Sequence, residues 1–173
     1  MTVRRVMGPE TEYAVSAPAV SHANPVQLSF DVIGAAADPE RSRIRWDYRQ
    51  EDPVNDARGT RLERAAARPG LLTDEPQLNI VNVIAPNGGR MYVDHAHPEY
   101  SAPETTDPFE AVRYDHAGDL LMRRAAASAS VGTGHDIVLH RNNVDGKGAS
   151  WGTHENYMML RSVPFDTVAA LMT

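Results

Sequence analysis

The stretch Gly88-Gly89-Arg90-Met91-Tyr92-Val93-Asp94-His95-Ala96-His97-Pro98-Glu99-Tyr100 decides the fold of this chain. Two glycines form a turn, and the residues after them have the pattern of a strand. Alternate side chains of a strand share a face, which gives this strand an apolar face and a polar face. The apolar face, Met91 and Val93, suits a core, and the polar face consists of Arg90, Tyr92 and Asp94.

A proline close to the end of this stretch affects the next acidic residue. We expect Pro98 to interrupt the strand, so that Glu99 approaches the polar face from a bend. A cation, a phenol and two carboxylates together indicate a binding or catalytic site. An edge strand with a solvated outer face would show the same pattern, so this stretch alone leaves both interpretations open.

A second acidic strand, predicted over residues 6–15, favours the site. Glu10 and Glu12 are two positions apart and therefore share one face of that strand. Like charges on one face repel each other unless a cation lies between them. Mg²⁺ prefers oxygen ligands and is commonly shared with nucleotide phosphates, so it is the simplest candidate.

Composition narrows the class of protein. The 173 residues, of which 42% are hydrophobic, suffice for one globular domain with a core. A net charge of −6 argues against a general nucleic-acid role, and the absence of cysteine excludes disulfides and thiolate chemistry. No apolar run approaches 20 residues and no signal peptide is recognised, so we expect a soluble, cytoplasmic protein without a membrane segment.

The first half of the chain predicts a helix, a strand and a long loop. Asn24 and Pro25 open a helix over residues 24–37, whose inward side chains would be Leu28, Val32 and Ile33. Residues 43–48 can form a strand. Residues from about 50 to 75 contain few large apolar side chains, so we expect a mobile loop there, either functional or a solvated linker.

The second half predicts a hairpin and a long helix. Residues 78–84 form a strand that turns at 86–89 into the strand from Arg90. Asp107 is the expected helix N-cap, Pro108 the first helical residue and Glu110 the partner in a capping box, with the helix ending before Gly132. Its expected inward residues are Phe109, Val112, Leu120 and Leu121.

The C-terminal part adds strands over 136–140 and after the glycine-rich turn 144–148, which lacks the spacing of a phosphate-binding loop. In the second strand His154 and Asn156 share one face, and Glu155 and Tyr157 share the other. We favour the first pair for a site, because imidazole suits a metal and an amide suits a nucleotide. A histidine hydrogen-bonded within the sheet is the alternative. An amphipathic helix begins at Phe165 and is unfinished where the sequence stops, which suggests the first part of a longer protein.

Three motifs, at residues 8–13, 88–100 and 148–157, resemble the Dop/PafA family, whose members deamidate Pup, remove it from proteins or ligate it to them. The resemblance covers essentially the whole chain. It implies an α+β, glutamine-synthetase-like fold: a curved antiparallel β-sheet cradle flanked by helices, with residues 1–173 as an incomplete, N-terminal part of the catalytic domain. It also implies ATP and Mg²⁺ as cofactors, and Pup and pupylated proteins as partners.

Two features resemble the depupylase branch of the family. Glu10 and Tyr92 are 82 positions apart, whereas the ligase branch has a shorter interval, and residues 50–75 fall where depupylases carry their characteristic loop. The residues after Asp94 also resemble the depupylase form. The implied activity is hydrolysis of the isopeptide bond between Pup and substrate lysines, together with deamidation of the C-terminal glutamine of Pup.

The resemblance also implies roles for individual residues. The matching catalytic residue is Asp94, acting as nucleophile or as base towards water. The expected metal ligands are Glu10, Glu12, Tyr92, Glu99 and His154. The expected nucleotide contacts are Glu10, Thr11, Glu12, Tyr13, Ala14, Arg90, Ser101, Ala102 and Asn156. Two alternatives are a Pup–protein ligase and an inactive fragment that needs its C-terminal part as a separate chain.

Overall fold

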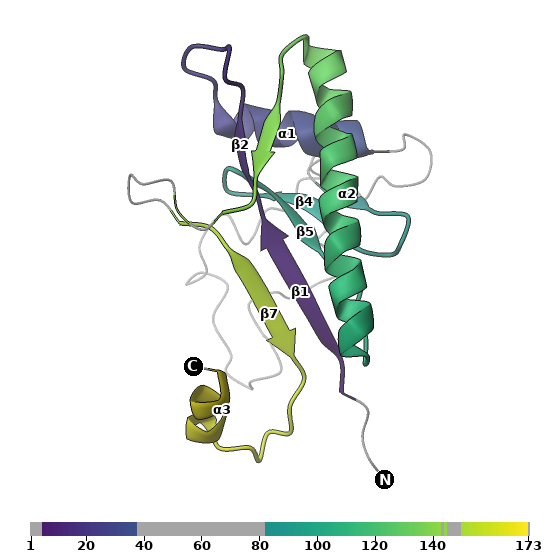
Figure 1. The fold of residues 1–173 in the computed structure, drawn as a ribbon, viewed down its shortest axis with the longest axis vertical. Coiled ribbons are helices and arrows are strands. Elements are labelled where there is room, and N and C mark those ends of the chain that lie inside the picture. Colours follow the sequence, from purple (N-terminus) through teal and green to yellow (C-terminus); the bar gives the residue numbers. More distant parts are fainter. Residues whose placement is uncertain (1–4, 38–81, 143, 145–149, 173) are drawn as a thin grey trace, which may run out of the picture.

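A computed structural model describes residues 5–37, 82–142, 144 and 150–172 (Figure 1). The strand predicted at 43–48, the loop predicted at 50–75 and the first part of the strand predicted at 78–84 lie outside these residues. In chain order the elements are β1 (Met7–Glu12), β2 (Ala14–Ser16), α1 (Pro25–Ala36), β3 (Asn82–Ile84), β4 (Arg90–Asp94), β5 (His97–Ser101), α2 (Pro108–Thr133), β6 (Val138–His140), β7 (Thr153–Tyr157) and α3 (Phe165–Met172).

The main sheet has the strand order β3-β4-β5-β1-β7, and each neighbouring pair is antiparallel. The strand expected over 6–15 is divided: β1 belongs to the main sheet, and β2 pairs with β6 in a separate two-stranded sheet. The division falls at Tyr13, whose amide donates to the carbonyl of Pro98 at 3.0 Å. The predicted α+β class with an antiparallel sheet is thereby confirmed.

The prediction that Pro98 interrupts its strand is wrong. Pro98 lies inside β5, opposite Val93 of β4, and Glu99 is a strand residue opposite Tyr92. The proline is tolerated because pairing of β5 with β1 ends at the Glu12–Glu99 pair, just before the position of the missing N–H. Glu99 therefore reaches the polar face by regular alternation and not from a bend.

Helices α1 and α2 pack against each other and cover one face of the main sheet (Figure 1). The start of α1 is as predicted, with the Asn24 side chain accepting hydrogen bonds from the amides of Val26 and Gln27. Its expected inward residues are buried and join a core whose members from the sheet are Val83, Met91 and Tyr100. None of the helices in the described part of the chain combines the length and apolar character needed to cross a bilayer.

The prediction of which residues of α2 face inward is mostly wrong. Phe109, Val112 and Leu120 are exposed, and only Leu121 packs against the core. The inner face consists instead of Ala111, Gly118, Met122, Ala125, Ala126 and Ala129. A glycine is required at position 118 because the helix backbone passes directly over the Tyr100 ring, which occupies the space that a side chain there would need.

The two ends of α2 also differ in part from the prediction. Asp107 caps the helix as expected by accepting from the amide of Phe109 at 2.8 Å. Glu110, however, accepts a hydrogen bond from the hydroxyl of Thr105, outside the expected capping box. The helix includes Gly132 and ends at Thr133, where Gly134 adopts a left-handed conformation with φ of 73°.

Candidate metal and catalytic site

The face of the sheet opposite the helices carries two rows of polar side chains, set by strand register. In the first row Glu10 of β1 lies between Ser101 of β5 and His154 of β7. In the second row Glu99 of β5 lies between Glu12 of β1 and Tyr92 of β4. These residues share a face because strand side chains alternate, so β1 contributes its even-numbered residues to the site.

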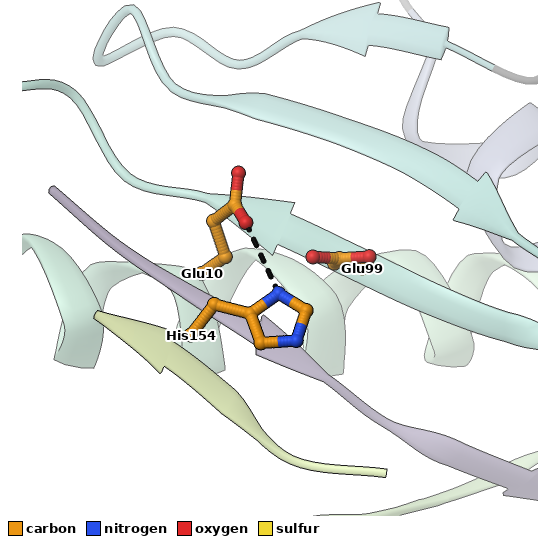
Figure 2. A group of neighbouring side chains, drawn as sticks. All are labelled: Glu10, Glu99 and His154. Atoms are coloured by element: carbon orange, nitrogen blue, oxygen red, sulfur yellow. Dashed lines mark hydrogen bonds and ion pairs between the residues drawn. The ribbon is translucent and has the colours of Figure 1, made fainter. Parts of the chain in front are cut away.

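Three of these side chains form a group that can hold a cation (Figure 2). One ligand atom from each of Glu10, Glu99 and His154 lies within 4.8 Å of the other two. His154 Nδ1 is 3.3 Å from Glu10 Oε2, and Figure 2 shows Glu99 beside them on the same face. A second group of the same dimension joins Glu99 to Glu12 and Asp94, so Glu99 is common to both.

Glu99 is the most constrained carboxylate of the site. It is 1% exposed, and its Oε2 accepts no hydrogen bond from any residue that the structure describes. Burial, and then the negative charges of Glu10, Glu12 and Asp94, raise the pKa of Glu99 to about 6, while its hydrogen bond with Tyr92 acts in the opposite direction. A buried carboxylate oxygen without a partner is costly unless a cation approaches it.

Tyr92 and Ser101 connect the two rows. Burial raises the pKa of Tyr92 well above its usual range, as does the neighbouring Glu99, so the phenol stays protonated at neutral pH. The Ser101 hydroxyl donates to Glu10 Oε1 at 2.8 Å, and the Arg90 guanidinium lies 4.1 Å from the centre of the Tyr92 ring. Among the residues that the structure describes, Arg90 thus places a cation at the edge of the site, and carboxylates predominate in its middle.

Asp94 ends β4 at the rim of this face, opposite His97. Its Oδ1 is 2.6 Å from Nδ1 of His95, an exposed residue at the tip of the hairpin. His95 has a φ of 53°, in the left-handed region that favours glycine, because only two residues connect β4 to β5. The sequence reading did not single out His95; its position beside Asp94 in a two-residue turn was the available signal.

The structure brings together five of the residues expected to contact a nucleotide. They line one cavity beside the first row: Glu10, Arg90, Ser101, Ala102 and Asn156. Asn156 is two residues beyond His154 on the same face of β7, and its Nδ2 donates to the carbonyl of Gly8 at 3.3 Å. The cavity thus adjoins Glu10, which belongs to both the cavity and the metal group.

The other residues expected to contact a nucleotide do not line this cavity. The side chains of Thr11 and Tyr13 lie on the opposite face of the sheet, where they bond to Asp115 and Asp119 of α2. Ala14 lies in β2, paired with His140. Alternation along the strand explains Thr11 and Tyr13, and it was already visible for Glu10 and Glu12 in the sequence. Glu12 lies on the site face but outside this cavity, in the second row.

Two contacts at the second row were missed from the sequence. The amide of Gly152 donates to Glu12 Oε2 at 2.8 Å, which fixes that carboxylate from the turn before β7. The buried ring of Trp151 lies 5.4 Å from the ring of His97, centre to centre. Gly152 and Trp151 belong to the motif at residues 148–157, but nothing in its spacing indicates which strand it meets.

The donor set fits Mg²⁺. It offers carboxylate and phenol oxygens with one imidazole, and the unpartnered Oε2 of buried Glu99 points to a missing positive charge. Among the described residues Glu10, Glu99 and His154 would hold one ion, and Glu12 would lie beside it together with Glu99 and Asp94.

Comparisons with known proteins identify the family and the fold. The family described as Pup-ligase protein matches residues 5–173. The chain is 50% identical over 167 residues to the depupylase of Acidothermus cellulolyticus, covering 94% of this chain and 33% of that one. It is 48% identical over 176 residues to the Pup deamidase/depupylase of Mycolicibacterium smegmatis, covering 99% of this chain and 35% of that one.

Ligases match a smaller part of the chain. The Pup–protein ligase of Bifidobacterium adolescentis is 42% identical over 94 residues, which cover 50% of this chain and 19% of the ligase. The crystal structure of the complex between the prokaryotic ubiquitin-like protein Pup and its ligase PafA superposes with a TM-score of 0.64 at 24% identity, covering 95% of this chain and 27% of that chain. That likeness confirms the fold.

The chain spans about a third of the length of the curated depupylases that it matches. In those relatives the remaining length is part of the same polypeptide. The expectation of a C-terminal part supplied as a separate chain therefore gains no support from them.

Proposed function

The chain belongs to the Pup-ligase protein family, and from that premise we propose that it is part of an ATP- and Mg²⁺-dependent Pup deamidase and depupylase. The choice between the depupylase branch and the ligase branch rests on how much of this chain each kind of relative matches. The two depupylases match 94% and 99% of this chain, whereas the ligase matches 50%. The substrate would be an amide at the C-terminal side chain of Pup, joined either to ammonia or to a protein lysine.

The metal would be held by Glu10, Glu99 and His154, with Tyr92 and Glu12 beside it. When bound, Mg²⁺ supplies positive charge that polarises an amide carbonyl and offsets negative charge that develops on its oxygen. The buried, unpartnered Oε2 of Glu99 supports this assignment. ATP would occupy the adjoining cavity, which Arg90, Ser101, Ala102 and Asn156 line next to Glu10.

Asp94 is the proposed catalytic residue. Its carboxylate lies at the rim of the site, within reach of the Glu12 and Glu99 carboxylates and open to solvent at 41% side-chain exposure. It either attacks the amide carbon directly or takes a proton from the water that does. In direct attack Asp94 forms a mixed anhydride with the amide carbon as the carbon–nitrogen bond breaks, and water then hydrolyses that anhydride; in the base mechanism water adds to the amide carbon itself. In both cases the nitrogen takes up a proton and leaves as ammonia or as the lysine amine, and one water is consumed.

Hydrolysis is tested by mass spectrometry on Pup ending in glutamine, incubated with this chain, Mg²⁺ and ATP. Conversion to the glutamate form, lost in Asp94→Asn, is the expected result. The same assay is run on a chimera in which this chain replaces the matching third of the M. smegmatis depupylase, so that all parts of the relative are present. An inactive chimera that still binds Mg²⁺ and ATP would contradict the proposal.

A Pup–protein ligase is the second candidate, because ligases belong to the same family. Ligation would produce ADP in proportion to new isopeptide bonds, whereas the proposed hydrolase releases amine without that proportion. The same chimera, supplied with Pup ending in glutamate and an acceptor protein, separates the two.

A further inference from the structure

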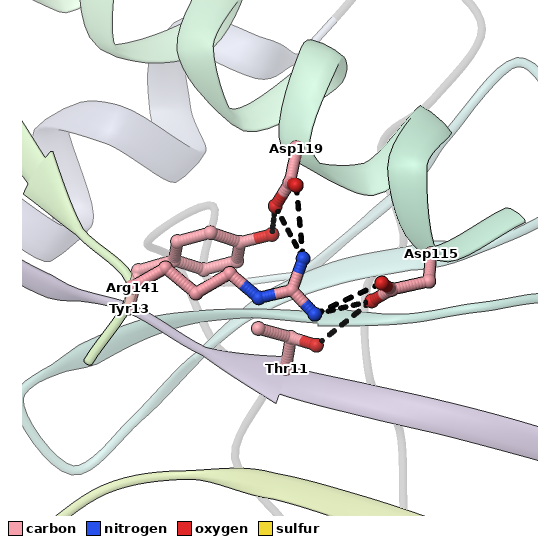
Figure 3. A network of polar contacts seen from close by, with 5 residues as sticks. All are labelled: Thr11, Tyr13, Asp115, Asp119 and Arg141. Carbon is pink, nitrogen blue, oxygen red and sulfur yellow. Dashed lines mark hydrogen bonds and ion pairs between the residues drawn. The ribbon is translucent and has the colours of Figure 1, made fainter. Parts of the chain in front are cut away.

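Arg141, just after β6, connects two carboxylates of helix α2 on the back of the sheet (Figure 3). Its Nη1 donates to both oxygens of Asp119 at 3.0 and 2.9 Å, and its Nη2 donates to both oxygens of Asp115 at 2.9 Å. The two aspartates are four residues apart, so they face the same way from adjacent helical turns and repel each other without a cation. Arg141 therefore determines where both carboxylates lie.

The same two carboxylates also bind Thr11 of strand β1 and Tyr13, the residue that follows this strand. The Thr11 hydroxyl donates to Asp115 Oδ1 at 3.2 Å, and the Tyr13 hydroxyl donates to Asp119 Oδ1 at 2.7 Å. Thr11 is 1% exposed and Tyr13 is 4% exposed, so neither hydroxyl can readily exchange its partner for water. Figure 3 shows the guanidinium between the two aspartates, with Thr11 and Tyr13 reaching them from the sheet.

Along β1, residues whose side chains bond to α2 alternate with residues whose side chains face the metal site. Thr11 stands between Glu10 and Glu12, the two β1 residues whose side chains point to the opposite face. Hydrogen bonds to β5 and β7 join β1 to its neighbours within the sheet, but they do not connect it to α2. The Thr11 and Tyr13 links fix β1 relative to the helix, because any shift lengthens both.

We propose that Arg141 is a positioning residue for the metal site: by holding Asp115 and Asp119 it fixes β1 through Thr11 and Tyr13, and thereby sets Glu10 and Glu12 for the cation. This inference rests on the proposed function. It assigns to Thr11 and Tyr13 a positioning role on the back face, in place of the nucleotide contact expected from the family resemblance. The planar fork of arginine is needed, since lysine cannot donate to two carboxylates in this paired geometry.

The test is the affinity of the chain for Mn²⁺, a probe for the Mg²⁺ site, measured by calorimetry without nucleotide. Arg141→Lys is expected to weaken binding about tenfold, as changes to the residues that orient metal ligands do. Thr11→Val, which keeps the shape but removes the donor, should weaken it as well, and Thr11→Ser should restore it. Val32→Ala, in the buried core on α1, is the control for a general loss of stability.

A second measurement follows the metal-free chain. Amide hydrogen exchange of Glu12, whose N–H bonds to the carbonyl of Gly152, should quicken in Arg141→Lys more than in Val32→Ala at equal global stability. Unchanged Mn²⁺ affinity in Arg141→Lys, or an equal loss in Val32→Ala, would overturn the inference while the metal site stands. A wild-type chain that binds no Mn²⁺ would overturn the proposed function and the inference with it.

Discussion

Glu10 and His154 are 144 residues apart in the chain, yet they face each other across β1 and β7 with His154 Nδ1 3.3 Å from Glu10 Oε2. This pair exists only because the last strand of the described chain returns to lie beside the first. The candidate site depends on that return, since β5 supplies the Glu99 carboxylate beside β1 and β7 supplies the imidazole. Changes at the two strands should therefore affect metal binding in separable ways.

The first prediction concerns His154→Ala, which removes the imidazole from an exposed strand. We expect Mn²⁺ affinity to fall about tenfold, equivalent to about 1.4 kcal/mol, with little change in the unfolding midpoint. His140→Ala, an exposed histidine of β6 that bonds to Ser16, is the matched control. Calorimetric titration of both variants measures the difference, and equal affinities would exclude His154 as a ligand.

The second prediction concerns Glu99→Gln, which replaces a buried carboxylate by its neutral isostere. Folding raises the pKa of Glu99 from 4.5 to about 6, so the folded state holds its proton more tightly and the ionised form costs about 2 kcal/mol at pH 7. Without metal, the free energy of unfolding of the variant should exceed that of wild type by about 2 kcal/mol. The variant should also no longer gain stability from Mg²⁺. Urea unfolding with and without Mg²⁺ measures both effects.

The stability difference between metal-free Glu99→Gln and wild type should depend on pH with a definite sign. Below pH 4.5 Glu99 is protonated in both states, so wild type and Glu99→Gln should be equally stable; the difference should grow as pH rises to about 6 and stay constant above it. Glu104→Gln, at an exposed position, should be unchanged within about 0.5 kcal/mol. A Glu99→Gln variant that is less stable than wild type at pH 7 would contradict the assigned cost of the buried charge.

The third prediction uses two glycines of α2. A methyl group at Gly118 would overlap the Tyr100 ring, so Gly118→Ala should destabilise the chain by about 1–3 kcal/mol. Gly132 has open space around its Cβ position, and Gly132→Ala should stabilise by about 0.5–1 kcal/mol through higher helix propensity. Thermal unfolding of the two variants checks the close approach of helix and sheet, and similar effects in both would argue against it.

The fourth prediction separates the two roles left open for Asp94. Asp94→Asn should abolish deamidation in the chimera and leave Mn²⁺ affinity within about threefold, because Glu10, Glu99 and His154 remain. In a single turnover of wild type in ¹⁸O-labelled water, a base mechanism places the label only in the product. Label found on Asp94 identifies direct attack, because it arises when water opens a mixed anhydride at the Asp94 carbonyl. Full activity of Asp94→Asn would remove Asp94 from the mechanism.

Several elements were predictable because they depend on local rules. Short-range patterns predict the helix caps at Asn24 and Asp107 and the hairpin between β3 and β4. They also predict which side chains of β4 form its polar face. The common face of Glu10 and Glu12 follows from alternation along one strand. These features need no knowledge of what the strands or helices pack against.

The inner face of α2 could not be read from its composition. Phe109, Val112 and Leu120 are the larger apolar side chains, and a hydrophobic stripe through them is a reasonable expectation for an isolated helix. The ring of Tyr100, on β5, occupies the space beside Gly118, so no side chain fits at that position of the helix. That constraint arises from packing and has no signal in the helix itself.

The sequence by itself determined which residues can serve the site, because strand alternation and residue chemistry are local properties of the chain. Only the tertiary structure decided which of them meet. Strand order places β5 and β7 on either side of β1, so Glu99 and His154 join Glu10, while Thr11 and Tyr13 turn away to Asp115 and Asp119. The physical reason is register: pairing between distant strands fixes neighbours across the sheet, and no spacing within one strand encodes it.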